Sequence, residues 1–270
     1  MRIFMLACVA LLVAAVTPAH AGLLCTIVVD ARDGTVVFEQ GKKCGERVTP
    51  ASTFKIALAI MGYDAGFLAD AHSPVLAFRQ GDPDWGGDAW KRPVDPAAWM
   101  RHSVVWYSQR IARELGARRM SDYAAGFGYG NADFSGDPGK DNGLDRAWIS
   151  SSLRISPREQ VAFLRRFVRG DLPVAAAAIA RTEAIVEGAE AAGWRLRGKT
   201  GSAYPRRPDG AFDRARPWGW YVGWAEKGGR RLVFAHLVQD ERRETVSGGL
   251  RARSALLASW PDMVARLAAK

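Results

Sequence analysis

The chain has 270 residues, of which 38 are lysine or arginine and 28 are aspartate or glutamate, so its formal net charge is +10. This length allows a large core, in one domain or in two closely packed lobes. The basic residues are scattered along the chain, many of them as pairs such as Arg118-Arg119 and Arg242-Arg243. Because nucleic-acid binding needs a concentrated basic patch, we expect no nucleic-acid partner. We interpret the charge as a solvated basic surface that attracts small anions or anionic envelope components.

The first 21 residues have the order of a secretory signal peptide. A basic start at Arg2 is followed by an apolar run through Val16 and by the ending Ala19-His20-Ala21. This order predicts cleavage after Ala21, with a retained N-terminal anchor as the alternative. The apolar run is too short to span a membrane comfortably. We therefore expect residues 22–270 to form a single periplasmic domain without stable membrane insertion.

Two cysteines, Cys25 and Cys44, remain after that cleavage. They flank a predicted hairpin, in which the β-rich runs 26–30 and 35–38 surround an Asp-Gly turn. In an exported protein this placement favours a disulfide over two buried free thiols. The sequence contains no Cys-x-x-Cys or His-Glu-x-x-His pattern, and its remaining histidines are far apart, so we expect no metal site.

The rest of the chain predicts a sheet interrupted by a helical insertion. A loop rich in proline, glycine and tryptophan spans 73–96, and residues 96–172 are predicted to be mostly helical. An amphipathic helix closes the chain at 249–269. The order predicts an α/β protein of the α+β type, in which helices flank an antiparallel sheet and a mostly helical lobe covers about residues 70–173. The other predicted elements are an alanine-rich helix at 174–186 and strands at 194–199, 218–225 and 231–239.

The segment Ser52-Thr53-Phe54-Lys55 places a hydroxyl and an amine three residues apart, just before an apolar, helix-forming run. If a helix starts near Ser52, both side chains share one face at its N-terminus, where free backbone N–H groups favour developing negative charge. A serine hydroxyl becomes a good nucleophile when a base takes its proton, and a lysine can act as that base when its pKa is depressed. The alternative is a helix-capping Ser52 followed by a surface lysine.

Three further motifs combine hydroxyl, amide or amine groups with small neighbours. Ser103-Val104-Val105 begins a predicted helix, where Ser103 is a possible cap. Tyr129-Gly130-Asn131 lies in a glycine-rich loop, where a tight turn is the alternative interpretation. Lys199-Thr200-Gly201-Ser202 ends a predicted strand, where the lysine projects a cation and the glycine lets the backbone approach a ligand closely.

In this order the four motifs resemble those of the class D (OXA-type) β-lactamases, which are penicillin-recognising serine enzymes. That family carries Ser-x-x-Lys, Ser-x-Val, Tyr-Gly-Asn and Lys-Thr-Gly, and the resemblance covers essentially the whole mature chain. Trp148 stands where the family has a tryptophan, and Arg251 where it has a carboxylate-binding arginine. Ser202 is a departure, because the family often has an aromatic or bulky residue after Lys-Thr-Gly. The class A pattern fits less well, since no Ser-Asp-Asn string is present.

The resemblance implies the penicillin-recognising fold and hydrolysis of β-lactams through a covalent acyl-serine intermediate. Ser52 would be the nucleophile, and Lys55 would be N-carboxylated to serve as general base. Carbon dioxide or bicarbonate would supply the carboxyl group, and no other cofactor is implied. Val105 would line the apolar pocket around this group, and Trp148 would donate its indole N–H to it.

The resemblance also implies how the substrate is held. Ser103 would relay a proton to the leaving nitrogen, with Lys199 setting the local field. The backbone N–H groups of Ser52 and Ser202 would hold the oxyanion. The residues implied in substrate binding are Thr200, Gly201, Ser202 and Arg251.

Other functions stay open on the same scaffold. A β-lactam sensor would be acylated without deacylating, and the complete lysine–tryptophan set argues against it. A D,D-peptidase would act on peptidoglycan, and the short chain argues against it. A binder of anionic polymers is opposed by the dispersal of the basic residues. We expect small β-lactams as partners of a protein that is a monomer or a homodimer.

Overall fold

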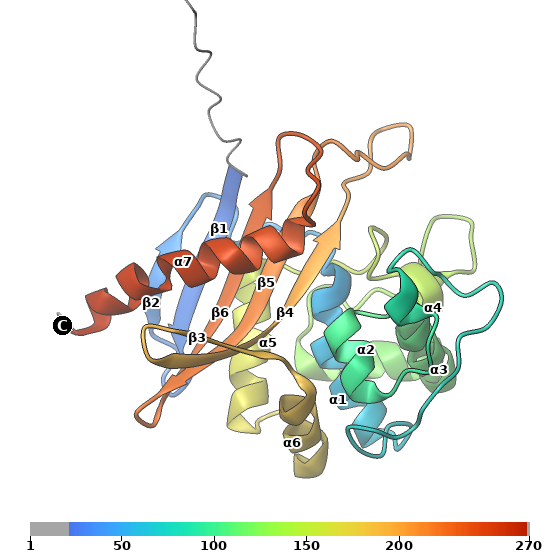
Figure 1. The fold of residues 1–270 in the computed structure, drawn as a ribbon, viewed down its shortest axis with the longest axis horizontal. Helices are drawn as coiled ribbons and strands as arrows, with labels where there is room; N and C mark the ends of the chain where they lie inside the picture. Colours follow the sequence, from blue (N-terminus) through green and yellow to red (C-terminus); the bar gives the residue numbers. More distant parts are fainter. Residues whose placement is uncertain (1–21, 269–270) are drawn as a thin grey trace, which may run out of the picture.

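A six-stranded, fully antiparallel sheet forms the centre of the molecule (Figure 1). The structure is a computed structural model that describes residues 22–268, so the predicted signal peptide at 1–21 lies outside the described residues. The strands follow the spatial order β2-β1-β6-β5-β4-β3, and the predicted hairpin is formed by β1 and β2. Their bounds are β1 (Gly22–Asp30), β2 (Val36–Gln40), β3 (Gly188–Ala191), β4 (Trp194–Ala203), β5 (Trp218–Lys227) and β6 (Arg230–Gln239).

Helices flank this sheet and form a lobe beside it, which confirms the predicted α+β class (Figure 1). The helices α2, α3 and α4 gather on one side of the sheet, as the predicted helical insertion requires. The helix α5, which is also within the predicted lobe range, packs on β1, β5 and β6. The bounds are α1 (Lys55–Asp64), α2 (Pro96–His102), α3 (Val105–Phe127), α4 (Gly143–Arg146), α5 (Pro157–Arg169), α6 (Ala176–Ile185) and α7 (Gly248–Ala268), with the 3-10 helices η1 (Ala51–Phe54) and η2 (Asp88–Trp90).

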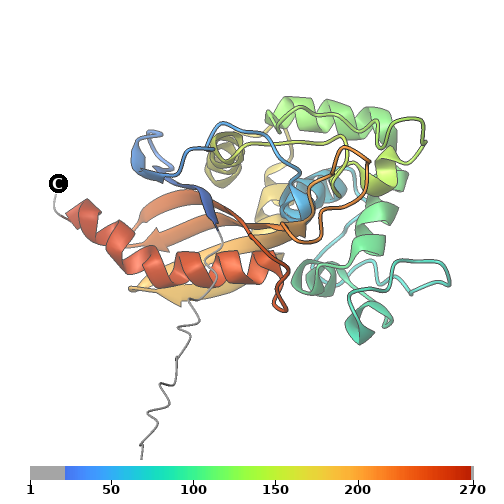
Figure 2. The same ribbon diagram turned by 90° about the horizontal axis from the view of Figure 1, so that it is seen from above.

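The central strands are buried on both faces, because a helix covers each face of the sheet (Figure 2). Successive strand residues point to opposite faces, so a strand covered on both sides is apolar almost throughout. On β6, Phe234 contacts Trp260 of α7 at a ring distance of 5.7 Å. On the other face, Phe167 of α5 contacts Trp224 of β5 at 5.4 Å. The sheet is therefore packed between α5 on one face and α7 on the other.

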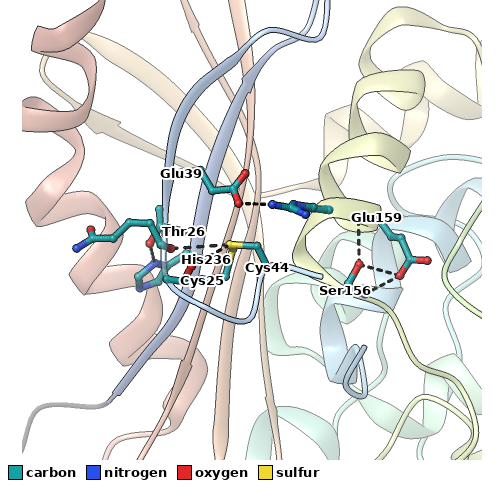
Figure 3. Close-up of a disulfide and its surroundings, with 10 residues drawn as sticks. Cys25, Thr26, Glu39, Cys44, Ser156, Glu159 and His236 are labelled. Carbon is teal, nitrogen blue, oxygen red and sulfur yellow. Dashed lines mark hydrogen bonds and ion pairs between the residues drawn. A yellow bond between two sulfur atoms is a disulfide. The ribbon is translucent and has the colours of Figure 1, made fainter. Parts of the chain in front are cut away.

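A disulfide ties the first strand to the segment after the hairpin (Figure 3). The sulfur atoms of Cys25 and Cys44 are 2.05 Å apart, and both residues are buried. The bond confirms the disulfide expected from the sequence. Next to Cys25, the Thr26 hydroxyl lies 2.7 Å from Nδ1 of His236, and burial lowers the pKa of that imidazole to about 4. Burial therefore favours the neutral form of the His236 imidazole beside β1.

We expect removal of the disulfide to destabilise the protein without changing its fold. The bond closes a segment with a sequence separation of 19, and a loop of this size contributes about 3 kcal/mol in the chain-entropy model. Urea unfolding of the Cys25→Ala/Cys44→Ala double variant should show a loss of this order, and reduction of the wild type should reproduce it. Equal free energies of unfolding for the double variant and the oxidised wild type would contradict the expectation.

Candidate active site

Ser52 and Lys55 meet at the joint between η1 and α1. Ser52 lies in η1, Lys55 begins α1, and the Nζ of Lys55 is 3.2 Å from the Oγ of Ser52. The helix α1 is buried on nearly all sides, so the lysine at its start is carried into the interior, where it is only 1% exposed. The alternative of a capping serine and a surface lysine is wrong, because Pro50 is the N-cap of η1 and no side chain caps that helix.

Burial makes Lys55 an unusual lysine. Loss of solvation, aided by the nearby charge of Lys199, holds the pKa of Lys55 well below its ordinary value of 10.5. Lys199 is buried as well, and burial lowers its pKa to about 8 against the opposing field of Glu187. A neutral amine can accept a proton or attack an electrophile, whereas an ammonium ion can do neither. The site therefore places a basic nitrogen within hydrogen-bond distance of a hydroxyl.

The surroundings of this pair are apolar. Phe54, between Ser52 and Lys55 in sequence, packs against Trp148 at a ring distance of 5.5 Å. Trp148 is 1% exposed, and its carbonyl accepts a 2.8 Å hydrogen bond from Thr49. Val105, the first residue of α3, is buried too. Loss of solvation on burial is the main reason that the pKa of Lys55 is lowered.

The strand β4 runs past the Ser52 turn, and one glycine makes this close approach possible. A Cβ atom at Gly201 would lie 2.9 Å from the carbonyl oxygen of Pro50 and 3.2 Å from the amide nitrogen of Thr53. The prediction that the strand ends near Lys199 was wrong, because β4 continues its pairing with β5 as far as Ala203. The motif Lys199–Ser202 thus lies inside a rigid ladder rather than at a strand end.

Ser103 occupies the tight turn between α2 and α3. Asp95 is the N-cap of α2, and its side chain accepts a hydrogen bond from the N–H of Ala98. Ser103 is the C-cap of the same helix and has the left-handed conformation with φ 58°. Ser103 is thus a cap, at the C-terminus of α2 rather than at the start of α3. A non-glycine residue with positive φ is held there by its surroundings, and such positions cluster at functional sites. The Ser103 side chain is half-buried in this turn.

The loop motif at 129–131 packs against the segment that follows Trp148. Gly130 has φ +59°, and a Cβ there would lie 2.0 Å from the carbonyl oxygen of Arg154. Asn131 accepts a 2.8 Å hydrogen bond from the N–H of Arg154 and donates a 2.9 Å bond to the carbonyl of Ser152. Gly130 and Asn131 therefore join the loop to the segment after Trp148, which is the tight-turn alternative rather than a ligand contact.

Tyr129 lies beside a buried chain of hydrogen bonds that sequence analysis missed. Its ring packs on Phe54 at 5.5 Å, and its hydroxyl is buried beside Thr53 and Gln160. Gln160 of α5 donates a 3.0 Å hydrogen bond to Thr53 Oγ1, which in turn donates a 2.7 Å bond to the carbonyl of Pro50. These hydrogen bonds hold the turn that carries Ser52. Their only sequence signal was a glutamine on an otherwise apolar helix face.

Arg251 lies in the first turn of α7, beside the end of β4. The N–H of Gly249 donates a 2.8 Å hydrogen bond to Ser202 Oγ, which joins this helix to the Lys-Thr-Gly-Ser motif. The guanidinium of Arg251 forms an ion pair with Asp240, and its Nη1 is 3.7 Å from Glu244. The two acids had no sequence signal, because the segment after β6 is irregular and lacks any motif.

Among residues 22–268, no group of three or more histidine, cysteine, aspartate or glutamate side chains is arranged to hold a metal ion. Within the same residues, every helix is too short or too polar to cross a membrane.

We expect Gly130→Ala to destabilise the protein strongly, because the new Cβ would meet the Arg154 carbonyl in a backbone conformation that already disfavours it. A loss of about 3 kcal/mol or more in the free energy of unfolding should be measured. Gly139→Ala is the matched control, since φ there is +70° and the added Cβ has open space around it, so about 1 kcal/mol is expected. Equal losses in the two variants would refute the supporting role of this loop.

Comparison with known proteins agrees with this geometry. The family model of the penicillin-binding protein transpeptidase domain matches residues 24–258. β-Lactamase OXA-9 of Klebsiella pneumoniae is 44% identical over 243 residues, which cover 90% of this chain and 88% of the relative. β-Lactamase OXA-1 of Escherichia coli is 34% identical over 232 residues, 85% of this chain and 80% of the relative. The crystal structure of the class D β-lactamase OXA-427 superposes with a TM-score of 0.84 at 45% identity, covering 90% of this chain and 99% of that one. The chain belongs to the penicillin-binding protein transpeptidase family and, within it, to the class D β-lactamases.

Proposed function

We propose that this protein hydrolyses β-lactams through an acyl-enzyme formed on Ser52. The observation that carries the proposal is the 3.2 Å approach of a buried lysine nitrogen to the Ser52 hydroxyl, in a chain of the class D family. The oxygen of Ser52 attacks the lactam carbonyl, the C–N bond of the ring breaks, and the ring nitrogen takes up a proton. Water then hydrolyses the ester and frees the serine.

We also propose that Lys55 carries a carboxyl group on its Nζ. A neutral amine is the form that attacks carbon dioxide, and burial favours that form here. When bound, the group supplies a carboxylate-like base within reach of Ser52. Trp148 is suited to donate its indole N–H to it, because indole nitrogen is a donor only. Val105 keeps water away from the same niche.

The residues around the Ser52 turn divide the remaining work. The N–H groups of Ser52 and Ser202 hold the oxyanion, and one such donor typically contributes about two to three orders of magnitude in rate. Ser103 passes a proton to the ring nitrogen, and Lys199 sets the field along that path. The close packing of Gly201 on Pro50 and Thr53 supports this assignment, because it brings β4 against the nucleophile. Thr200 and Arg251 bind the substrate carboxylate.

We also propose that the protein acts in the periplasm, because its first 21 residues have the order of a cleavable signal peptide. The disulfide between Cys25 and Cys44 supports an oxidising compartment. Edman sequencing of the mature protein would locate the cleavage site.

Replacement of Ser52 or Lys55 should abolish turnover of nitrocefin. Ser52→Ala removes the nucleophile and should lower kcat by at least about three orders of magnitude, and Lys55→Ala removes its base with a similar loss. Lys42→Ala, at an exposed lysine, is the matched control and should keep wild-type rates. Thermal unfolding of each variant shows whether its fold is retained.

The same assay separates the alternatives. One turnover followed by a stable adduct would indicate a sensor, and cleavage of D-Ala-D-Ala peptides without β-lactam turnover would indicate a D,D-peptidase. A folded Ser52→Ala variant with full activity would overturn the proposal.

Activity should depend on carbon dioxide and fall on acidification. The Lys55 amine is neutral above its lowered pKa and protonated below it. A lower pH therefore favours the ammonium form and the loss of the carboxyl group. In buffer depleted of carbon dioxide the rate should fall, and added bicarbonate should restore it. With ¹³C-bicarbonate, a carbamate resonance should appear in the wild type and be missing in Lys55→Ala. Equal rates with and without bicarbonate, together with no such resonance, would exclude this base.

A further inference from the structure

The guanidinium of Arg251 is held between two carboxylates that differ in their surroundings. Asp240 follows the end of β6 and is 2% exposed, and its N–H donates a 3.0 Å hydrogen bond to the carbonyl of Pro217. Its carboxylate forms an ion pair with Arg251. Removing one partner of such a buried pair leaves an uncompensated charge, so the pair is costly to break. Asp240 is therefore a fixed anchor for Arg251.

Glu244 is the second and looser partner. Its carboxylate is 3.7 Å from Nη1 of Arg251, a quarter of its side chain is exposed, and Oε1 accepts a 3.0 Å hydrogen bond from Nε of Arg242. It lies on the irregular segment between β6 and α7 rather than in a helix or strand. Partly exposed ion pairs contribute little to stability, so breaking the contact between Glu244 and Arg251 costs little free energy.

Together the two acids flank the guanidinium of Arg251, while Arg242 pairs with Glu244 from its other side. An incoming carboxylate therefore competes with the two acids for the same guanidinium. An arginine fork can pair with two carboxylates at once, one on each side. The ion pair with the buried Asp240 is the costlier one to break, so an incoming carboxylate would replace Glu244 rather than Asp240.

We propose that Glu244 is an internal competitor for Arg251, which an anionic substrate must displace before its own carboxylate binds. The proposal rests on the proposed function, in which Arg251 binds the substrate carboxylate. Asp240 is a positioning residue that keeps the guanidinium in place while this exchange occurs. Glu244 then lowers the affinity for anionic β-lactams and leaves neutral analogues unaffected, so it sets the charge preference of the site.

The test compares Glu244→Gln with Glu241→Gln in the full-length enzyme. Glu241 is an exposed acid of the same segment and is not one of the two partners of Arg251, so its replacement makes the same change in net charge without touching the pair. The substrates are nitrocefin and the methyl ester of the same cephalosporin, which lacks the carboxylate. For each variant, kcat and kcat/KM are measured separately.

Glu244→Gln should raise kcat/KM for nitrocefin about twofold to fivefold, the range of a partly exposed ion pair, with kcat unchanged. The ester should show no gain, Glu241→Gln should match the wild type, and the effect should vanish in an Arg251→Ala background. A gain shared by Glu241→Gln, a gain shared by the ester, or a loss in kcat/KM would overturn the proposal. Failure of the wild type to turn over nitrocefin would instead remove the proposed function itself.

Discussion

The approach of the buried Lys55 amine to the Ser52 hydroxyl is the contact on which the site depends. A lysine is rarely buried, because its charged form loses several kcal/mol of solvation in an apolar interior. The lowered pKa of Lys55 reduces this penalty, because it favours the neutral amine. A neutral amine is also the form that can attack carbon dioxide, so the requirement of the fold and that of the proposed chemistry coincide at Lys55.

The rest of the molecule keeps this contact in place. The helix α1 is surrounded by other elements, so its first residue cannot turn to solvent. The buried chain from Gln160 through Thr53 fixes the preceding turn, and β4 closes it from the other side at Gly201. Lys199, on that strand, adds a second positive group that disfavours protonation of Lys55. The sheet and the helices thus hold the Lys55 Nζ close to the Ser52 Oγ.

Much of this could be predicted from the sequence. Apolar runs on buried strands and the Asp-Gly turn gave the sheet and its hairpin, and the spacing of Ser52 and Lys55 gave the reactive pair, because both signals are local. The extent of β4 was missed, since residues beyond Lys199 carry small side chains and are held by pairing with β5. Asp240 and Glu244 were also missed, because their meeting with Arg251 depends on how β6 and α7 are joined in space.

The central claim is that the fold lowers the pKa of the Lys55 amine before it takes up a carboxyl group, and the titration of this amine tests the claim directly. Lysine labelled with ¹³C at Cε reports the protonation of each amine by NMR, and Lys55→Arg assigns the resonance. In buffer free of carbon dioxide, the Lys55 signal should titrate well below the ordinary value of 10.5, while exposed lysines such as Lys42 stay near it. A Lys55 signal that titrates together with the exposed lysines would contradict the account.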